Sequence, residues 1–356
     1  MQHISYPSTG QFRDVIRTVR DRANWDNVPV PTLKFRGTTK LHGTCSSVVL
    51  DYSGMYPQIY AQSRERVLSI ESDNYGFAAF VHKNKDLFFD ALVKSFNLEF
   101  PCPDDTNKII FYGEWAGQGV QKGVGISNIP KSLFIFAIKT VSGEGENEVT
   151  QWYSSERLMA STIFNDYLKT LNDNNIYFID QYPTWEIDID FNKPELAQNR
   201  LVELTNAVEQ ECPVSKSFGF ENTVGEGIVW KAVHNDNFNT SGLMFKVKGK
   251  KHSESKVKTL AEVDPEKVAG QKAFVEYAVT DYRLNKLLDK FKENGYSLEV
   301  ESTGEFIKSV CKDVISEESD TLVESNLVWK EVAPRVSNKA RNFYLEKLNQ
   351  EIFNKE

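Results

Sequence analysis

Cysteine is scarce in this sequence, and its four cysteines, at positions 45, 102, 212 and 311, lie far apart. None belongs to a Cys-x-x-Cys pair or a histidine grouping, so neither a zinc site nor a disulfide framework is indicated, and the thiols are expected to be reduced. Long apolar runs are also missing, since no stretch approaches the roughly 20 residues that span a bilayer. The first residues, Met-Gln-His-Ile-Ser-Tyr-Pro, lack the basic and apolar regions of a signal peptide. We therefore expect a cytoplasmic protein with no membrane partner.

An excess of positive charge is absent as well. Lys and Arg number 42 against 50 Asp and Glu, which gives a net charge of -8 and a pI near 5.4. This balance excludes a protein that coats nucleic acid through its total charge. It leaves room for a local basic groove, because six lysines and His252 fall between Lys246 and Lys258. A solvated charged loop is the ordinary alternative for such a segment.

The sequence does contain enough apolar residues for packed cores, because 40% of its 356 residues are hydrophobic and 12% are aromatic. Apolar residues recur at helical spacing over residues 9–23, behind Ser8 and Thr9 as candidate caps. Segments rich in β-branched and aromatic residues predict strands at residues 46–52, 58–62, 108–115, 133–139, 176–179, 227–233 and 243–248. Helical patterns interrupt them at about residues 75–96, 155–171 and 194–211. This irregular mixture predicts an α+β domain of mainly antiparallel sheets with flanking helices.

Beyond about residue 258 the pattern becomes helical. The segment Val263-Asp264-Pro265-Glu266 is typical of a helix start with proline in the first turn. Amphipathic stretches follow through Leu287, residues 306–315 and residues 328–353. We therefore predict two domains, residues 1–258 and an all-helical C-terminal domain of residues 259–356.

Reactive chemistry is first indicated by Lys-Leu-His-Gly-Thr at Lys40 to Thr44, between a predicted strand ending near Thr39 and a tight turn at Gly43. This placement would present the Lys40 amine at the edge of a cleft. A lysine amine must lose its proton before it attacks, which requires nearby cations, a bound metal or partial desolvation. His42 is a candidate for positioning a metal or departing phosphates, and Gly43 lets the backbone approach a ligand. Taken alone, an exposed salt-bridged lysine and a hydrogen-bonded turn histidine are the simpler explanations.

Two glutamates each follow a glycine and lie within or beside apolar strand segments, namely Glu114 in Gly-Glu-Trp-Ala-Gly and Glu226 in Gly-Glu-Gly-Ile-Val. Burying an unpaired carboxylate is costly, so a cation or hydroxyl partner is expected for each. One could accept hydrogen bonds from a ribose, and the other could coordinate Mg²⁺. The residues themselves leave open which does which, and a salt bridge to lysine is the ordinary alternative for both.

Three lysines alternate with apolar residues near the end of this region, namely Lys231, Lys246 and Lys248. Strand periodicity turns Lys246 and Lys248 to the same side. Two like charges on one face repel unless an anion lies between them, and a triphosphate suits that place. A solvent-facing edge strand that avoids aggregation would carry the same pattern.

Taken in order, these motifs resemble those of the covalent nucleotidyltransferases, the superfamily of ATP-dependent ligases and messenger RNA capping enzymes. The run Gly-Glu-Trp-Ala-Gly-Gln-Gly-Val-Gln-Lys at residues 113–122 matches the pattern Gly-Glu-aromatic-Ala-Gly-x-Gly-x-Gln-Lys. Histidine at position 42, where DNA ligases and capping enzymes usually carry aspartate, is similar to the phage nick-sealing RNA ligases, the second RNA ligase type of T-even phages, and to trypanosome RNA-editing ligases. The resemblance runs from about Lys40 to Lys258. It implies a nucleotidyltransferase (ATP-grasp-like ligase) domain over residues 1–258.

The resemblance also implies roles for the reactive residues. Lys40 would be the nucleophile that carries AMP, and Glu226 would support metal-dependent chemistry, with His42 as a second candidate near the metal. Lys231, Lys246 and Lys248 would hold phosphates, and the last two would share in catalysis.

The rest of the nucleotide pocket is implied in the same way. Gly43 would lie against the nucleotide, Arg64 would contact the nucleotide and the RNA end, and Glu114 would bind the ribose. Phe136 would stack on adenine, with Phe134 as an alternative. At Ala137 relatives often have aspartate, so whatever contact that aspartate makes is missing here.

The implied enzyme is an ATP-dependent RNA ligase that uses ATP and Mg²⁺ or Mn²⁺. AMP would pass from ATP to lysine, then to an RNA 5′-phosphate, and a 3′-hydroxyl would expel it. The expected partner is RNA with 5′-phosphate and 3′-OH ends at a nick in a duplex. The protein would act as a monomer, in the host cytoplasm if it is of phage origin.

Three other functions compete with this hypothesis. A capping guanylyltransferase would use GTP and usually append an OB-fold of short strands after Lys246, where this sequence predicts helices. A DNA ligase is closer in chemistry, and only the histidine in the first motif argues against it. A degenerate nucleic-acid-binding module would have no need to keep Lys40, Glu114, Glu226, Lys246 and Lys248 together.

Overall fold

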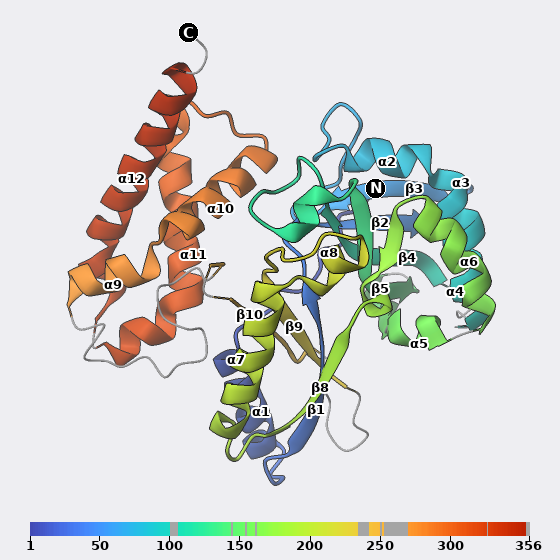
Figure 1. Cartoon of the computed structure of the whole chain (residues 1–356), viewed down its shortest axis with the longest axis horizontal. Coiled ribbons are helices and arrows are strands. Elements are labelled where there is room, and N and C mark those ends of the chain that lie inside the picture. Colours follow the sequence, from blue (N-terminus) through green and yellow to red (C-terminus); the bar gives the residue numbers. More distant parts are fainter. Residues whose placement is uncertain are drawn as a thin grey trace. The chain divides into compact units, whose positions relative to one another are not determined.

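The computed structural model describes residues 1–99, 106–143, 145–153, 155–160, 162–233, 242–249, 251–252, 270–325 and 327–353. The chain divides into two compact units, Met1–Gly249 and Lys250–Glu356 (Figure 1). The predicted domain boundary between residues 258 and 259 and the predicted helix start at residues 263–266 lie outside the described residues.

A four-stranded antiparallel sheet, sheet A, forms one half of the first unit. It comprises β1 (Thr32–Lys40), β8 (Thr184–Asp190), β9 (Gly227–Ala232) and β10 (Met244–Lys248) in the order β10-β9-β1-β8. The helices α1 (Phe12–Trp25) and α7 (Glu195–Gln210) pack against it. Phe35 on β1 contacts Phe245 on β10, which also packs on Phe12 of α1. Because side chains alternate along a strand, the opposite face of β1 presents Lys34, Arg36, Thr38 and Lys40.

The second sheet, sheet B, has the order β3-β2-β4-β5-β6, and every neighbouring pair in this path is antiparallel. Its strands are β2 (Thr44–Asp51), β3 (Gln58–Ser63), β4 (Thr106–Ala116), β5 (Ser132–Ser142) and β6 (Val149–Tyr153). A short strand, β7 (Ile176–Phe178), pairs in parallel with β5. The turn between β2 and β3 is closed by Asp51, whose carboxylate accepts hydrogen bonds from the Ser53 backbone N–H and hydroxyl.

One face of sheet B carries the largest apolar core, in which Val48, Phe111 and Ile135 pack against Phe88 and Phe164. The covering helical segments are α2 (Phe77–Lys83), α3 (Lys85–Leu87), η1 (Phe88–Val93), α4 (Lys94–Glu99), α5 (Ser155–Ala160) and α6 (Thr162–Asp173). The segment predicted as one helix over residues 75–96 is therefore several pieces. Asn84 ends α2, and η1 is a π-helical turn that buries Phe88, Ala91 and Leu92 together.

The chain crosses between the two sheets at two described places. It passes from β1 to β2 through Leu41–Gly43, and it returns from β7 to β8 through η4 (Ile179–Gln181) and Tyr182. An apolar cluster that includes Leu41, Phe134 and Ile179 joins these crossings. The short helices α8 (Pro213–Ser217), η2 (Gly125–Asn128) and η3 (Gly145–Asn147) complete the unit.

Every secondary-structure element described in the second unit is a helix. Its elements are α9 (Gln271–Ala278), α10 (Asp281–Glu293), η5 (Val300–Ser302), α11 (Thr303–Glu324) and α12 (Trp329–Phe353). Apolar side chains such as Leu284, Phe306 and Tyr344 form its core. Buried Arg283 pairs with Glu318 at 2.9 Å, where α11 departs from helical backbone geometry.

The predicted fold class, α+β with mainly antiparallel sheets and a helical C-terminal region, is confirmed. None of the described helices combines the length and apolar character needed to cross a bilayer. The predicted caps of α1 are wrong. The helix begins at Phe12, and the Asp14 carboxylate accepts a hydrogen bond from the Gln11 backbone N–H, while Ser8 is hydrogen-bonded to Arg64.

Candidate active site

Lys40 and Glu226 meet at the end of sheet A. Lys40 is the last residue of β1, and Glu226 immediately precedes β9. The Lys40 Nζ lies 2.7 Å from Glu226 Oε2. The lysine side chain is 21% exposed, whereas that of the glutamate is 2% exposed. The lysine side chain is therefore partly open to solvent while its carboxylate partner is buried.

Two further cationic or potentially cationic side chains surround the same carboxylate. Lys248 Nζ lies 3.5 Å from Glu226 Oε1, and His42 Nδ1 lies 3.5 Å from Oε2. Burial disfavours the charged form of Glu226, but the charges of Lys40 and Lys248, with His42, outweigh burial and hold its pKa well below the ordinary value of 4.5. The site thus holds a buried, ionised carboxylate within a ring of donors.

Gly227 explains why these side chains can converge. The sheet register aligns Lys40, Gly227 and Lys248 across three strands. Gly227 has a positive φ of 153°, and a Cβ there would lie 2.1 Å from the Val247 carbonyl oxygen. Only glycine suits this position, and its missing side chain lets the backbone of β9 approach that of β10 closely where Lys248 begins its reach toward Glu226.

Glu114 reaches the same region from sheet B. It lies on β4, and its Oε1 accepts a hydrogen bond of 3.0 Å from the Gly43 backbone N–H. Burial, reinforced by the charge of Glu226, raises the pKa of Glu114 to about 7 despite the opposing effect of Lys40. Cys45 lies opposite Glu114 in the sheet, and burial together with Glu114 raises its pKa to about 12. A thiol with that pKa is not a nucleophile at neutral pH.

The raised pKa of Glu114 predicts a pH-dependent stability. An acid whose folded pKa lies above its unfolded value stabilises the fold below the unfolded value, and this stabilisation is lost as pH rises through the folded value. For Glu114 the window runs from about 4.5 to about 7. The shift corresponds to about 3 kcal/mol. We expect the stability of the Glu114→Gln variant to show no such decrease as pH rises through this window.

Urea unfolding of the wild type and the Glu114→Gln variant at pH 5 and pH 7.5 measures this effect. Because the other titrating groups are common to both proteins, the difference between them isolates Glu114. The free energy of unfolding of the wild type, measured relative to that of the variant, should be larger at pH 5 than at pH 7.5. A difference that does not change with pH would contradict the assigned pKa.

Phe136 and Lys231 form a second contact between the sheets. The Lys231 ammonium donates a hydrogen bond of 2.7 Å to the Phe136 carbonyl oxygen and lies 5.2 Å from the centre of the Phe136 ring. The ring of Tyr6 packs edge-on against Phe136 at 5.0 Å. Phe134 is fully buried and stacks on Tyr177, which is core packing. Of the two phenylalanines, Phe136 is the one with exposed surface.

The remaining predicted site residues lie on neighbouring elements. Arg64 follows β3, is exposed, and donates a hydrogen bond to Ser8 Oγ at 3.1 Å. Lys246 is half-buried on β10, two positions before Lys248. Ala137 is buried opposite Tyr112. The structure therefore gathers Lys40, His42 and Lys248 around the Glu226 carboxylate. Glu114 is joined to this group through Gly43. Arg64 and Lys231 contact other partners.

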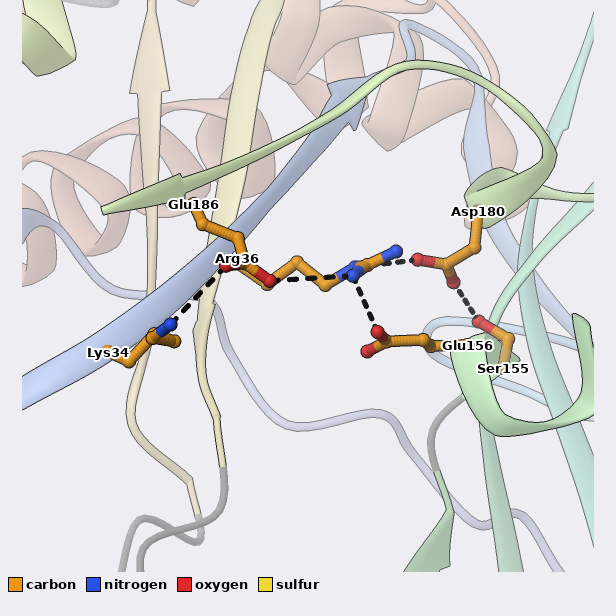
Figure 2. A network of polar contacts seen from close by, with 6 residues as sticks. All are labelled: Lys34, Arg36, Ser155, Glu156, Asp180 and Glu186. Atoms are coloured by element: carbon orange, nitrogen blue, oxygen red, sulfur yellow. Dashed lines mark hydrogen bonds and ion pairs between the residues drawn. The ribbon is translucent and has the colours of Figure 1, made fainter. Parts of the chain in front are cut away.

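Sequence reasoning missed several polar residues around this site. Buried Asn74 donates a hydrogen bond of 3.1 Å to the Thr44 hydroxyl, next to the strand that carries Cys45. Arg36, on the same face of β1 as Lys40, forms ion pairs with residues of three other elements (Figure 2). Arg36 and Lys40 are four residues apart on one strand, and this even spacing was the sequence signal that could have placed them on the same face.

Comparison with known proteins gives the family. A protein-family model described as RNA ligase matches residues 33–248. This span covers more than half of the chain, and the chain belongs to the RNA ligase family. A comparison with curated protein sequences gives no match.

Solved structures of an RNA ligase from Naegleria gruberi are similar to this chain. A variant with ATP and Mn is 15% identical, with a TM-score of 0.40, and the match covers 70% of this chain and 56% of that one. The same ligase with PPi is 16% identical with a TM-score of 0.40, and the match again covers 70% and 56%. This chain thus spans little more than half the length of those proteins.

Proposed function

We propose that this protein is an ATP-dependent RNA ligase that joins RNA 3′-OH and 5′-phosphate ends through an AMP carried on Lys40. Membership of the RNA ligase family supports the reaction class. The observation that supports the residue assignment best is the position of the Lys40 amine, 2.7 Å from buried Glu226 with Lys248 on the other carboxylate oxygen. This arrangement offers a nucleophile and phosphate-binding charge in one place.

In the first step the Lys40 nitrogen attacks the α-phosphorus of ATP. A nitrogen–phosphorus bond forms, the bond to the bridging oxygen breaks, and pyrophosphate leaves. Lys40 must give up its proton and its ion pair with Glu226 before it attacks. Lys248 and Lys246 lie at alternate positions of β10 and would neutralise charge on the phosphates as it develops.

A divalent metal fits this site when it arrives with the nucleotide. Among the described residues, no group of three or more His, Cys, Asp or Glu side chains is arranged to hold a metal ion. Mg²⁺ commonly uses only one or two protein carboxylates together with substrate phosphates and waters, and buried Glu226 supplies one. When bound there, Mg²⁺ or Mn²⁺ would neutralise phosphate charge, with His42 as a neighbour of the same carboxylate.

The nucleoside part of ATP would lie between the two sheets. Glu114 would accept hydrogen bonds from the ribose hydroxyls, beside the backbone of Gly43. Phe136 would stack on adenine, and Lys231, which is held by the Phe136 carbonyl, would face the nucleotide from sheet A. Arg64 would exchange its bond with Ser8 for the nucleotide or the RNA end.

In the two later steps AMP passes from Lys40 to the RNA 5′-phosphate, and the 3′-hydroxyl then attacks that phosphorus and releases AMP. We propose a nicked duplex as the substrate and a monomer as the active form. Sealing of a nicked RNA duplex, compared with a nicked DNA duplex of the same sequence, tests whether RNA is the substrate. Faster sealing of RNA is expected, and sealing of DNA alone would make the protein a DNA ligase.

The helical unit is proposed to engage the nucleic acid. Deletion of residues 260–356 should therefore spare formation of the lysine adduct and reduce nick sealing by at least about ten-fold, because it removes a binding surface and leaves the compact unit Met1–Gly249. Adduct formation and sealing are measured on the same preparation, with circular dichroism as the control for folding. Equal loss of both activities in a folded truncated protein would contradict this division of labour.

A further inference from the structure

Arg36 forms an ion-pair cluster beside the candidate active site, with partners that the site itself does not use. Its Nη1 lies 2.6 Å from Glu156 Oε1 and 3.9 Å from Glu186 Oε1, and its Nε lies 3.4 Å from Asp180 Oδ1. Asp180 in turn accepts a hydrogen bond from the Ser155 hydroxyl. Figure 2 shows the guanidinium pointing from β1 toward Asp180 and Glu156. We call Arg36, Glu156, Asp180 and Glu186 the Arg36 clasp.

The clasp lies where the chain crosses between the sheets. Arg36 and Glu186 face each other on β1 and β8 of sheet A. Asp180 belongs to η4, in the crossing that leads from β7 of sheet B to β8. Glu156 lies on α5, which follows β6 and packs against β5. One guanidinium therefore connects sheet A to two elements attached to sheet B.

The position of Arg36 on β1 links the clasp to the active site. Arg36 and Lys40 are four residues apart on one strand and share a face. The proposed nucleotide pocket is divided between the sheets, with Lys40, Glu226 and Lys248 on sheet A and Glu114 on sheet B. Any change in the spacing of the sheets changes the distance between the nucleophile and the ribose-binding carboxylate.

Other polar links, one from the β1–β2 crossing to sheet B and one between the sheets, lie inside the pocket itself. The Gly43 N–H donates to Glu114, and Lys231 donates to the Phe136 carbonyl. A bound nucleotide would compete for both of these donors or acceptors. Arg36 lies opposite Lys231 in the sheet register, but its own ion pairs are made with Glu156, Asp180 and Glu186, so the clasp can persist while the pocket exchanges its partners.

We propose that Arg36 is a positioning residue that sets the spacing of the two sheets for nucleotide binding and attack by Lys40. This inference rests on the proposed function. The side chains of Arg36 and Asp180 are 21% and 7% exposed, so their pairing is shielded from solvent. Lys34, on the same face of β1, offers the contrast: it pairs with Glu186 at 3.4 Å, and both side chains are about half exposed.

Kinetics of adduct formation test the positioning role. Arg36→Met removes the charge and keeps much of the length, and Lys34→Met is the matched control on the same strand face. We expect Arg36→Met to raise the KM for ATP on the order of five- to ten-fold with a smaller change in kcat, because misplaced partners weaken binding first. Lys34→Met should stay within about two-fold of the wild type. Asp180→Asn should act in the same direction as Arg36→Met, and the double variant should be no worse than the poorer single variant.

Hydrogen exchange gives a readout that does not depend on activity. In Arg36→Met the backbone amides of residues 179–182 should exchange faster than in the wild type, while those of α11 are unchanged. Faster exchange and a raised KM together support the clasp. Unchanged KM, even with a lowered Tm, would overturn it and leave Arg36 a purely structural ion pair. Absence of any adduct in the wild type would instead refute the proposed function. The two failures are distinguishable, because hydrogen exchange reports on the clasp without requiring adduct formation.

Discussion

Replacement of Lys40 by alanine should abolish formation of a covalent nucleotide adduct from ATP. The nitrogen that attacks phosphorus, which lies 2.7 Å from the buried Glu226 carboxylate, is removed. Sealing from ATP should therefore fall below detection. Joining of an RNA whose 5′ end already carries AMP should continue at a reduced rate, because the last step needs the pocket and not the nucleophile.

Lys34→Ala is the matched control for this experiment. Lys34 lies on the same face of β1 and has a surface ion pair with Glu186. Its loss should leave ATP-dependent labelling within about two-fold of the wild type. Normal labelling of the Lys40→Ala protein would refute the assignment of the nucleophile.

Replacement of Glu226 by glutamine should have the second largest effect, on both activity and stability. Glutamine keeps the shape but removes the charge that faces Lys40 and Lys248. Lys40 and Lys248 would lose the negative charge that lies between them, which costs about 3 kcal/mol. Adduct formation should fall by at least about 10²-fold, because the charges around the transferring phosphate are no longer balanced. Chemical denaturation and adduct kinetics measure the two effects.

The pH dependence of the stability of the Glu226→Gln variant tests whether the lost carboxylate charge causes its destabilisation. A carboxylate whose folded pKa is lowered stabilises the protein above its unfolded value, near 4.5, and this contribution is lost as pH falls through the folded value. The stability gap between wild type and variant should therefore be full at neutral pH and should shrink below about pH 4.5. Glu221→Gln, an exposed position in the same segment, should show no gap. A gap that stays constant down to acid pH would contradict the role of the charge.

The sequence was sufficient to predict the central strands of both sheets. The segments over residues 46–52, 108–115 and 227–233 coincide with β2, β4 and β9, because each is a run of β-branched and aromatic residues with buried positions. The motifs around Lys40, Glu114 and Glu226 also pointed to residues that the fold gathers. Glycine next to each glutamate was informative, since Gly227 allows the close approach of the β9 and β10 backbones beside Glu226.

Other features had no local signal strong enough to predict them. β8 is an edge strand, and it carries three acidic residues and only a single buried residue. Its pattern therefore does not resemble that of a core strand. The helical region over residues 75–96 contains a π-helical turn that spacing alone does not reveal. The members of the Arg36 clasp are scattered between positions 36 and 186, and only the crossing between the sheets brings them together.

The most direct test of the account is to locate the nucleotide on the protein. The purified chain is incubated with Mg²⁺ and ATP or, separately, GTP, and its intact mass and digested peptides are measured by mass spectrometry. We expect a mass increase of one AMP per chain from ATP, acid-labile and located on Lys40, with no adduct from GTP. AMP on another residue, an adduct from GTP alone, or no adduct from a protein shown to be free of bound AMP at the start would contradict it.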